Sequence, residues 1–414
     1  MKIWILAGIT PIMLLLCCTL PAAASDYTLG VFGNANEDGT IDLQDVEYTE
    51  RIVLGLNNQT QLADAEYDDK INILDMTQTE LIIFGMEKEL TIIDDVERVV
   101  TIDMPLERVI SIAGSYGPET FCAFGVQDGL VGVADYAKEN APHLNSFLED
   151  IPGVGGSKTP DVEKILELKP QIVHSYACYY QLHSENLEAT LNAAGIKLVP
   201  IDFHKAKTHH NAVMTMGYLL NRRERANELI DFEDEHLGLI EDRIRGLTDE
   251  QKPRVYLESY LDYRTCGSGG YLHDDVLIPC GGINIFEDVT GTIYIDPEAA
   301  IEKNPQVIIR TIHEGMVPSG YGVTNTSSMG ELRADTMNRP GWNHLDAVKN
   351  GRVYLISTAA SSTHASVFHS YFAKCLHPEL FGDINPEAIH AEWFERYLGI
   401  GYDGVWAYPP LESL

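Results

Sequence analysis

The chain has 414 residues, of which 62 are Asp or Glu and only 29 are Lys or Arg, so its formal net charge at pH 7 is −33. Such an acidic chain argues against nucleic acid as a partner, because phosphate binding requires a basic surface. At this length we expect two or three domains rather than one.

The first residues predict export. Lys2 precedes the apolar run IWILAGITPIMLLLCCTLP, which leads into three alanines ending at Ala24. A positive start, an apolar core and an A-x-A site are typical of a cleaved secretory signal, so we assign residues 1–24 to a signal peptide. We therefore expect an exported, extracytoplasmic protein that is associated with the membrane or the cell surface. An uncleaved anchor helix is the alternative, although the run is barely long enough to span a bilayer and contains Pro11.

A twelve-residue pattern occurs twice, as NANEDGTIDLQD and as DAEYDDKINILD. Each copy has oxygen-bearing side chains at positions 1, 3, 5, 9 and 12 and a backbone carbonyl at position 7, which is the spacing of a calcium loop. The predicted ligands of the first loop are Asn34, Asn36, Asp38, Thr40, Asp42 and Asp45. Those of the second loop are Asp64, Glu66, Asp68, Lys70, Asn72 and Asp75. A solvated acidic surface is the alternative interpretation.

Position 6 distinguishes the two loops. Gly39 occupies it in the first loop, where a sharp turn is needed and glycine has no Cβ to obstruct it. Asp69 occupies it in the second, so we expect the second calcium site to be weaker. Ile41 and Ile71, at position 8, are expected to pair their backbones across the two loops. Because a module of this size has little core, calcium should supply much of its folding free energy.

A single helical pattern follows each loop, VEYTERIVLG after the first and MTQTELIIFG after the second, and position 12 is Asp in both. Together these features resemble the type I dockerin module over residues 30–86. The resemblance implies a cohesin-type partner. It would contact four side chains near the helix starts, Leu43, Gln44, Ile73 and Leu74. A calcium-stiffened spacer beside the membrane is the alternative role.

Five cysteines follow the signal segment, at positions 122, 178, 266, 280 and 375. An odd, scattered set predicts neither a disulfide framework nor a zinc site. We expect buried free thiols, with one bridge between Cys266 and Cys280 as the alternative.

From about residue 90 the chain alternates strand and helix patterns. Residues 91–102 predict a small hairpin. The runs ERVISIA, GLVGVAD, PQIVHSY and IKLVPIDF predict strands, and GPETFCAFGV, VEKILELKP and LEATLNAAG predict helices between them, the last of which ends on Gly195 as a C-cap. This alternation indicates a mainly parallel sheet covered by helices, which we assign to an N-terminal α/β lobe at residues 90–206.

The alternation stops at residues 207–250, where a helical pattern with few breakers predicts a long linking helix. It resumes at RVYLES and continues through PEAAIEKNP, QVIIRTI and GRVYLIS to helices from about residue 365. We assign residues 251–414 to a C-terminal α/β lobe with its C-terminal helices. The predicted fold class is therefore α/β, with two lobes joined by a helical spine and preceded by a small α-helical, two-loop calcium module.

Several sequence blocks of the two lobes resemble those of a known protein family and occur in the same order. RVISIAGSYGPETFCAFGVQDGLVGVADY, PDVEKILELKPQIVHSY, LNAAGIKLVPID, CGGINIFED and YIDPEAAIEKNPQVII resemble the substrate-binding proteins of ABC importers for iron complexes and cobalamin. The resemblance covers about residues 90–400. It implies a protein that performs no chemistry. It would capture an iron complex, such as a siderophore or haem, or a corrinoid between its lobes, and deliver it to a permease dimer with its ATPase.

The same resemblance implies two docking carboxylates, Glu163 in PDVEKIL and Glu298 in DPEAAI, that meet arginines of the permease. The alternative is that each is a solvated glutamate favoured by the dipole at a helix start.

Ligand-contacting loops are expected where strands end, in eight segments: 115–119, 135–138, 155–159, 175–181, 202–207, 259–270, 311–315 and 357–364. Their tyrosines would offer a large ligand both stacking area and a polar tip. The predicted ligand residues are Tyr116, Tyr136, Tyr179, Tyr180, His204, Tyr263, Arg264, Arg310 and His313. The segments also contain Tyr176, Tyr260 and His364.

Other functions have weaker support. A bare metal-ion site is suggested by HKAKTHH, but its histidines at 204, 209 and 210 form no i, i+4 pair. An enzyme is disfavoured because the sequence contains no GxSxG, no P-loop and no GxGxxG after a strand. A scaffold or cell-surface interaction protein, whose dockerin-like module sets its main role, is the remaining alternative.

Overall fold

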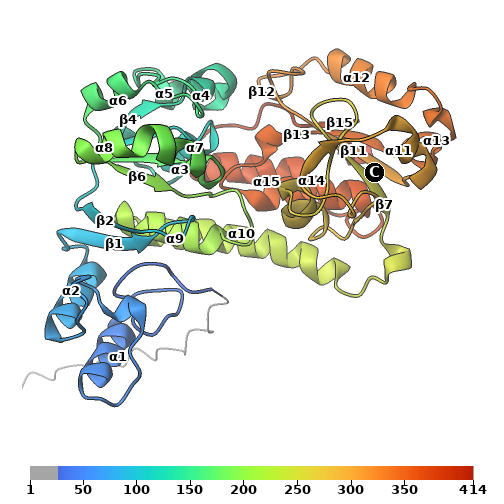
Figure 1. Cartoon of the computed structure of the whole chain (residues 1–414). Helices are drawn as coiled ribbons and strands as arrows, with labels where there is room; N and C mark the ends of the chain where they lie inside the picture. Colours follow the sequence, from blue (N-terminus) through green and yellow to red (C-terminus); the bar gives the residue numbers. More distant parts are fainter. Residues whose placement is uncertain (1–26, 414) are drawn as a thin grey trace, which may run out of the picture.

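The computed structural model describes residues 27–413. Two α/β lobes lie next to each other above a long helix, and a small helical module lies below the N-terminal lobe (Figure 1). The predicted α/β fold of two lobes joined by a helical segment is confirmed. The predicted signal peptide, residues 1–24, lies outside the described residues. In the part of the chain that the structure describes, no helix combines the length and the apolar character needed to cross a membrane.

The module contains two helices, α1 (Leu43–Val53) and α2 (Ile73–Phe84). Each helix starts at the end of a predicted calcium loop, because Asp42 and Asn72 cap the first turns with their side chains. The predicted hairpin follows as β1 (Glu89–Ile93) and β2 (Val99–Asp103), which pair antiparallel. The chain before α1 also pairs with β1, since an isolated bridge joins Val31 to Ile92.

The N-terminal lobe is built on a wholly parallel, four-stranded sheet in the order β4-β3-β5-β6. Its strands are β3 (Val109–Ser111), β4 (Leu130–Val133), β5 (Ile172–Ser175) and β6 (Lys197–Pro200). Its helices are α3 (Tyr116–Ala123), α4 (Asp135–Asn140), α5 (Asn145–Leu148), α6 (Val162–Leu168), α7 (Tyr180–His183) and α8 (Ala189–Ala193). Gly195 follows α8 with a left-handed φ of +75°, as its predicted capping role requires.

The linking segment differs from the single long helix that we predicted. It forms two helices, α9 (His209–Leu219) and α10 (Arg223–Ile244), separated at Asn221, whose φ is +52°. The helices approach closely: a Cβ added at Gly217 would lie 2.6 Å from the Cβ of Ala226. Only α10 runs on beneath both lobes (Figure 1). The sequence pattern predicted that this segment is helical. The turn between α9 and α10 was not predicted, because it depends on the left-handed backbone of Asn221 and on the contact between Gly217 and Ala226.

The C-terminal lobe contains a mixed sheet in the order β10-β8-β7-β11-β13-β15, with β9 also paired to β7. Its strands are β7 (Arg254–Ser259), β8 (Arg264–Cys266), β9 (Ile283–Asn284), β10 (Thr292–Tyr294), β11 (Val307–Ile312), β13 (Val353–Ser357) and β15 (Ala407–Tyr408). A separate pair joins β12 (Gly320–Tyr321) to β14 (Gly404–Val405). The helices are α11 (Pro297–Lys303), α12 (Ser327–Met337), α13 (Asp346–Lys349), α14 (Ala365–Leu376) and α15 (Pro386–Trp393).

One hydrophobic core connects the parts of the molecule. It includes Ile41 and Ile82 of the module, Met214 of α9, Phe232 of α10 and Phe368 of α14. The module is therefore packed onto the lobes and not suspended from them. All five cysteines after the signal segment are free thiols, and four of them are buried as expected, whereas Cys178 is exposed.

Candidate functional site

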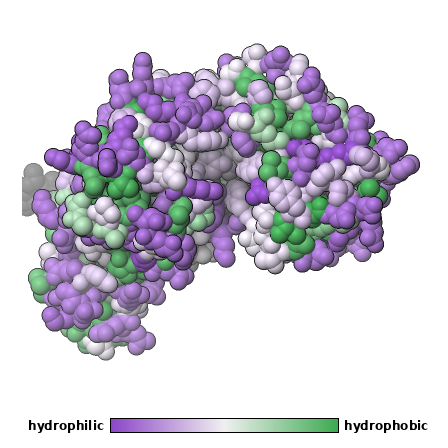
Figure 2. All heavy atoms as spheres, turned by 45° about the horizontal axis from the view of Figure 1, so that its top comes forward, coloured by the Kyte–Doolittle hydropathy of each residue, from purple (hydrophilic) through white to green (hydrophobic). Residues whose placement is uncertain are grey.

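A cleft of about 720 Å³ lies between the lobes, and the surface is visibly hollowed there (Figure 2). Each of the eight segments predicted from the strand ends contributes at least one lining residue. The parallel strands explain this result, because their carboxyl ends share one edge of each sheet and the loops that leave that edge face the other lobe. The volume lies in the range of about 300–1,000 Å³ that is usual for small-molecule sites.

The N-terminal lobe supplies an aromatic wall. Tyr116, Tyr136, Tyr176 and Tyr179 line the cleft together with His204. The ring of Tyr116 lies 6.2 Å from that of Tyr176 and 5.4 Å from that of His204, between ring centroids. Burial raises the pKa of Tyr116 and of Tyr176 well above the usual value, so both phenols stay protonated. Burial also lowers the pKa of His204 to about 4, so its imidazole is neutral at pH 7.

The C-terminal lobe supplies Tyr260, Arg264, Tyr271, His313 and Glu314. The ring centroids of Tyr260 and His313 are 5.3 Å apart. Burial raises the pKa of Glu314 and lowers that of His313, so it favours the neutral form of both groups. Tyr271 was missed, because it lies one residue beyond the predicted segment 259–270.

Two cations reach this cleft from opposite lobes. Lys158, from the loop before α6, places its Nζ 5.1 Å from the ring centroid of Tyr179. Arg264, at the start of β8, makes no side-chain hydrogen bond or ion pair with any residue in the range 27–413. The cleft thus offers two positive groups among neutral phenols and imidazoles, which suits a ligand with aromatic area and negative charge.

Three predicted ligand residues lie outside the cleft lining. Tyr180 packs beneath the guanidinium of Arg98, whose Cζ is 4.3 Å from the ring centroid, and donates to Glu188. Tyr263 and Arg310 both contact the buried carboxylate of Glu258, behind the cleft. Arg310 is only 3% exposed, because β11 is covered on both faces and its guanidinium bonds acidic partners there. Sequence position at a strand end could not reveal these partners, which are distant in the chain.

His364 lies at the junction of the lobes, behind the cleft. Its Nε2 is 3.0 Å from one carboxylate oxygen of Glu119, and the Nε2 of His143 is 3.0 Å from the other. Tyr116 adds a contact between the lobes, since its hydroxyl donates to the carbonyl of Thr358 at 3.0 Å. These contacts join α3 of one lobe to the 358–364 segment of the other.

The histidines of HKAKTHH do not converge. His204 lines the cleft, His209 is buried with its Nδ1 2.8 Å from the carbonyl oxygen of Phe203, and His210 pairs with Asp234. Across residues 27–413, no three His, Cys, Asp or Glu side chains are grouped so that they could hold a metal ion, and this result includes the carboxylates of the two predicted calcium loops.

The two predicted docking glutamates occupy equivalent places in the two lobes. Glu163 is the second residue of α6, which Asp161 caps, and Glu298 is the second residue of α11, which Asp296 caps. Both side chains are exposed. A helix dipole favours a carboxylate at this position, so the local geometry fits the solvated alternative as well as docking.

In the first predicted calcium loop, both oxygens of Asp45 accept backbone N–H groups, from Asn36 at 3.1 Å and from Asp42 at 2.8 Å. Burial raises the pKa of Asp45 to about 7, and the charges of Asp38 and Asp42 add to the rise. The Oδ1 of Asn34 is buried and has no hydrogen-bond partner among the described residues. Among the predicted ligands of this loop, the Oδ1 of Asn34 is thus a buried acceptor without a donor.

The second loop repeats this arrangement with greater exposure. Asp75 accepts from the backbone nitrogens of Glu66 at 3.1 Å and Asn72 at 2.8 Å, and burial raises its pKa too. Asp68 and Asp69, in contrast, are exposed. Asp69, at position 6 of this loop, has a φ of +66°, a strained backbone for a residue with a Cβ.

In the first loop the residue with a left-handed backbone is Glu37, with φ +60°, two positions before Gly39. One expectation for these loops was wrong. The backbone of Ile41 does not pair with that of Ile71. Its N–H and C=O both bond the hydroxyl of Tyr218, on α9, because the module packs against that helix.

Comparison with known proteins supports the lobes' assignment. The family model described as "Periplasmic binding protein" matches residues 110–360. The chain is 23% identical over 267 residues to the uncharacterized ABC transporter substrate-binding lipoprotein YvrC of Bacillus subtilis, which covers 64% of this chain and 77% of that protein. It is 27% identical over 217 residues to the high-affinity heme uptake system protein IsdE of Staphylococcus aureus, which covers 51% of this chain and 68% of that protein.

Solved structures show the same architecture. The TroA-like periplasmic binding protein FepB from Veillonella parvula superposes with a TM-score of 0.67 at 26% identity, over 77% of this chain and 98% of that one. The family match begins at residue 110, so the module with the two loops lies before it.

Proposed function

Since this chain belongs to the periplasmic binding protein family, we propose that it is the extracytoplasmic solute-binding protein of an ABC importer. The observation that carries the proposal is the cleft of about 720 Å³ between the lobes, lined by segments from the strand ends of both. A ligand bound there contacts both lobes at once. A protein that contacts the outer surfaces of both lobes can therefore distinguish the loaded form from the empty one. This role needs a binding site and no catalytic step.

We propose an anionic metal chelate with aromatic or planar area as the ligand, of the haem, ferric siderophore or corrinoid class. Six tyrosines line the cleft, and Lys158 and Arg264 bring positive charge from opposite lobes. The relative IsdE is described as part of a heme uptake system, which supports the same class. A bare metal ion has less support, because His204 and His313 are not joined by carboxylates in a ligating group.

Thermal stability against a ligand panel tests the assignment. The panel comprises haemin, several ferric siderophores, cobalamin and cobinamide, with zinc, manganese and molybdate as bare ions. A ligand at about a hundredfold over its Kd should stabilise the protein by roughly 2.7 kcal/mol. Arg264→Met should reduce the shift with an anionic chelate, whereas Arg245→Met, an exposed arginine 65% accessible in its side chain, should not. If only a bare ion stabilises the protein, or if no compound of the panel does, the proposed class of ligand is contradicted.

We propose further that Glu163 and Glu298 dock the loaded protein onto a permease dimer with its ATPase. They are exposed, lie on different lobes and occupy matching helix positions. Two carboxylates fixed on rigid elements could engage arginines in register, as charge-assisted pairs do.

For residues 30–86 we propose calcium binding in both loops. Each oxygen of Asp45 accepts one backbone N–H, which leaves a lone pair on each for a cation. The unpartnered Oδ1 of Asn34 and the raised pKa of Asp45 support the first loop, because a cation would satisfy one and neutralise the other. The exposed second loop, with its strained Asp69, would be the weaker site.

We propose that this module docks a partner of the cohesin type and holds it at the cell surface. Leu43, Ile73 and Leu74 are large apolar side chains that are 67%, 68% and 52% exposed, and Leu43 and Ile73 occupy equivalent places in the two repeats. Exposed apolar side chains grouped on a small acidic module suit a protein contact. Replacing Leu43 and Ile73 with serine should abolish capture of a purified cohesin domain without changing ligand binding. Unchanged capture would contradict this role.

A further inference from the structure

One loop of the cleft adopts an unusual backbone. Between β7 and β8, Tyr260 has φ +63° and Tyr263 has φ +58°. A left-handed backbone is unfavourable for a residue with a Cβ and persists only where the surroundings enforce it. The loop delivers two groups to the cleft, the ring of Tyr260 and the guanidinium of Arg264. Whatever enforces this conformation therefore sets part of the binding surface.

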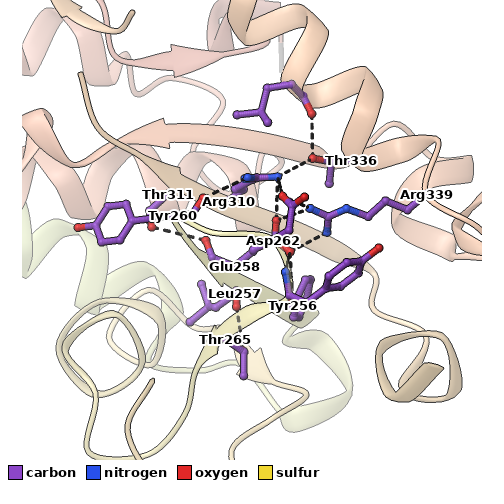
Figure 3. Close-up of polar contacts among 12 residues, drawn as sticks. Tyr256, Leu257, Glu258, Tyr260, Asp262, Thr265, Arg310, Thr311, Thr336 and Arg339 are labelled. Carbon is purple, nitrogen blue, oxygen red and sulfur yellow. Dashed lines mark hydrogen bonds and ion pairs between the residues drawn. The ribbon is translucent and has the colours of Figure 1, made fainter. Parts of the chain in front are cut away.

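A cluster of charges lies directly behind the loop, formed by Glu258, Asp262, Arg310 and Arg339 (Figure 3). Arg339 grips Glu258 with two nitrogens, at 2.6 and 2.8 Å. Arg310 Nη1 lies 3.0 Å from the same carboxylate. Asp262 Oδ1 is shared by both arginines, at 2.8 Å from Arg310 and 2.9 Å from Arg339. Two positive and two negative groups balance, so the cluster adds no net charge to the cleft.

The cluster holds the loop by its backbone. Arg310 Nη2 donates to the carbonyl of Tyr260 at 3.1 Å, and the amide of Tyr263 donates to Glu258 at 2.9 Å. The backbone nitrogen of Tyr260 also donates to the carbonyl of Thr311, next to Arg310, at 3.1 Å. Both left-handed residues are thus tied to the buried charges. In Figure 3 the phenol ring of Tyr260 points to the side opposite Arg339.

None of the four cluster residues lines the cleft. We propose that Arg310 and Arg339 are positioning residues: through Glu258 and Asp262 they fix the loop of residues 259–263, and so determine where Arg264 and Tyr260 meet an anionic ligand. The inference rests on the proposed function. It attributes the preference of the cleft for an anionic ligand in part to a cluster that does not contact the ligand. Arg264 contacts the ligand, and the cluster holds the loop that places Arg264.

The test uses Asp262→Asn, because the Asp262 side chain is 63% exposed and its loss leaves the buried Glu258 in place. Asp288→Asn is the matched control: Asp288 lies in the same lobe, is 66% exposed and pairs with Lys303 away from the cleft. Binding of haemin is compared with binding of its dimethyl ester, in which both carboxylates are neutral. We expect Asp262→Asn to reduce the preference for haemin by about tenfold, the effect of losing one charge-assisted contact, and Asp288→Asn to leave it unchanged.

A double-mutant cycle separates positioning from a general effect on stability. In an Arg264→Met background, Asp262→Asn should change the preference no further, because the group it positions is gone. In the protein that keeps Arg264, replacing Asp262 with glutamate should leave the preference for haemin over its ester as it is in the wild type. An Asp262→Asn protein with a lower Tm but an unaltered haemin-to-ester ratio would overturn the proposal, as would additive effects in the cycle.

Hydrogen exchange of the unliganded protein provides a readout that does not depend on the ligand. The amides of Tyr260 and Tyr263 should exchange faster in Asp262→Asn than in Asp288→Asn. If the wild-type chain binds neither probe, the proposed ligand class fails and this exchange result alone decides the positioning role. Equal exchange in the two variants would refute it.

Discussion

The hydroxyl of Tyr218, on α9, accepts a hydrogen bond from the backbone N–H of Ile41 at 2.7 Å and lies 3.3 Å from the carbonyl oxygen of the same residue. Ile41 belongs to the first predicted calcium loop, so this loop is tied directly to the segment that leads into α10. Asn211 adds a second tie, because its Oδ1 accepts from the backbone N–H of Gly30 at 2.8 Å. Anything bound to the module is therefore held at a fixed position relative to the cleft.

Tyr218→Phe should loosen the module. The substitution leaves the buried N–H and C=O of Ile41 without a partner, which costs about 1–3 kcal/mol. Limited proteolysis should then cut within residues 27–86 sooner than in the wild type. Tyr48→Phe is the control, because the Tyr48 hydroxyl has no hydrogen bond among the described residues. Equal protection of both variants would mean that the Tyr218 contact does not hold the module.

Calcium and pH should act together on the first loop. The pKa of Asp45 is about 7 in the folded loop, against an ordinary value of 3.8, so the folded state binds more protons between these values. Stability without calcium should therefore fall as pH rises from about 4 to about 7, by up to about 1.4 kcal/mol per pH unit for a single group. Calcium should restore it, because the ion replaces the proton.

Thermal unfolding with EDTA or calcium at pH 4.5 and pH 7.5 checks this. The stabilisation by calcium should be small at the lower pH and large at the higher one, and Asp45→Asn should remove the difference. A calcium effect that is the same at both values, or absent from both, would contradict the assignment of the loop.

Glu119→Gln should weaken the junction of the lobes. Burial alone would raise the pKa of Glu119, but His143 and His364 hold it well below the usual range, so the group is charged. A glutamine has one acceptor oxygen and cannot satisfy both imidazoles, and the loss should be about 2–3 kcal/mol. Because the folded pKa is depressed, the stabilisation by Glu119 is present above about pH 4.5 and is lost as pH falls further.

Urea unfolding at pH 7 and pH 4 measures both effects. The variant should lose more stability at pH 7 than at pH 4. Glu228→Gln, which disturbs an exposed pair with Arg225, should be nearly neutral. If the two variants behave alike, the contacts of Glu119 do not hold the lobes together.

Glu233→Gln should behave in the opposite way. Glu233, on α10, accepts from the backbone N–H and the hydroxyl of Ser366 at 2.7 Å each, at the start of α14. Burial raises its pKa to about 8, so the wild type should lose stability as pH rises from about 4.5 through 8. Glutamine keeps a neutral acceptor, and the variant should exceed the wild type in stability at pH 9 while matching it near pH 5. A wild type whose stability is flat over this range would disprove the assignment.

Sequence patterns located the lobes and the cleft because both depend on local order. Alternation of strands and helices fixed the sheets, and the strand ends fixed the eight segments that line the cleft. The residues whose contacts were predicted wrongly have partners that are distant in the chain. Arg310 pairs with Glu258, 52 positions away, and Tyr180 packs under Arg98, 82 positions away. Ile41 was expected to pair with Ile71 of the second loop, but Tyr218, 177 residues later in the chain, is its partner.

Docking to the permease gives the most direct test of the importer role. Glu163→Ala combined with Glu298→Ala should abolish ligand uptake in cells that carry the cognate permease and ATPase. Both side chains are exposed, so stability should change by less than about 0.5 kcal/mol. Ligand affinity of the purified protein should also be unchanged, because neither residue lines the cleft. The matched control is Glu167→Ala with Glu302→Ala, two exposed glutamates one turn further along α6 and α11. Uptake lost equally in the control would point to general acidity of this surface, and normal uptake by the first variant would refute the docking assignment.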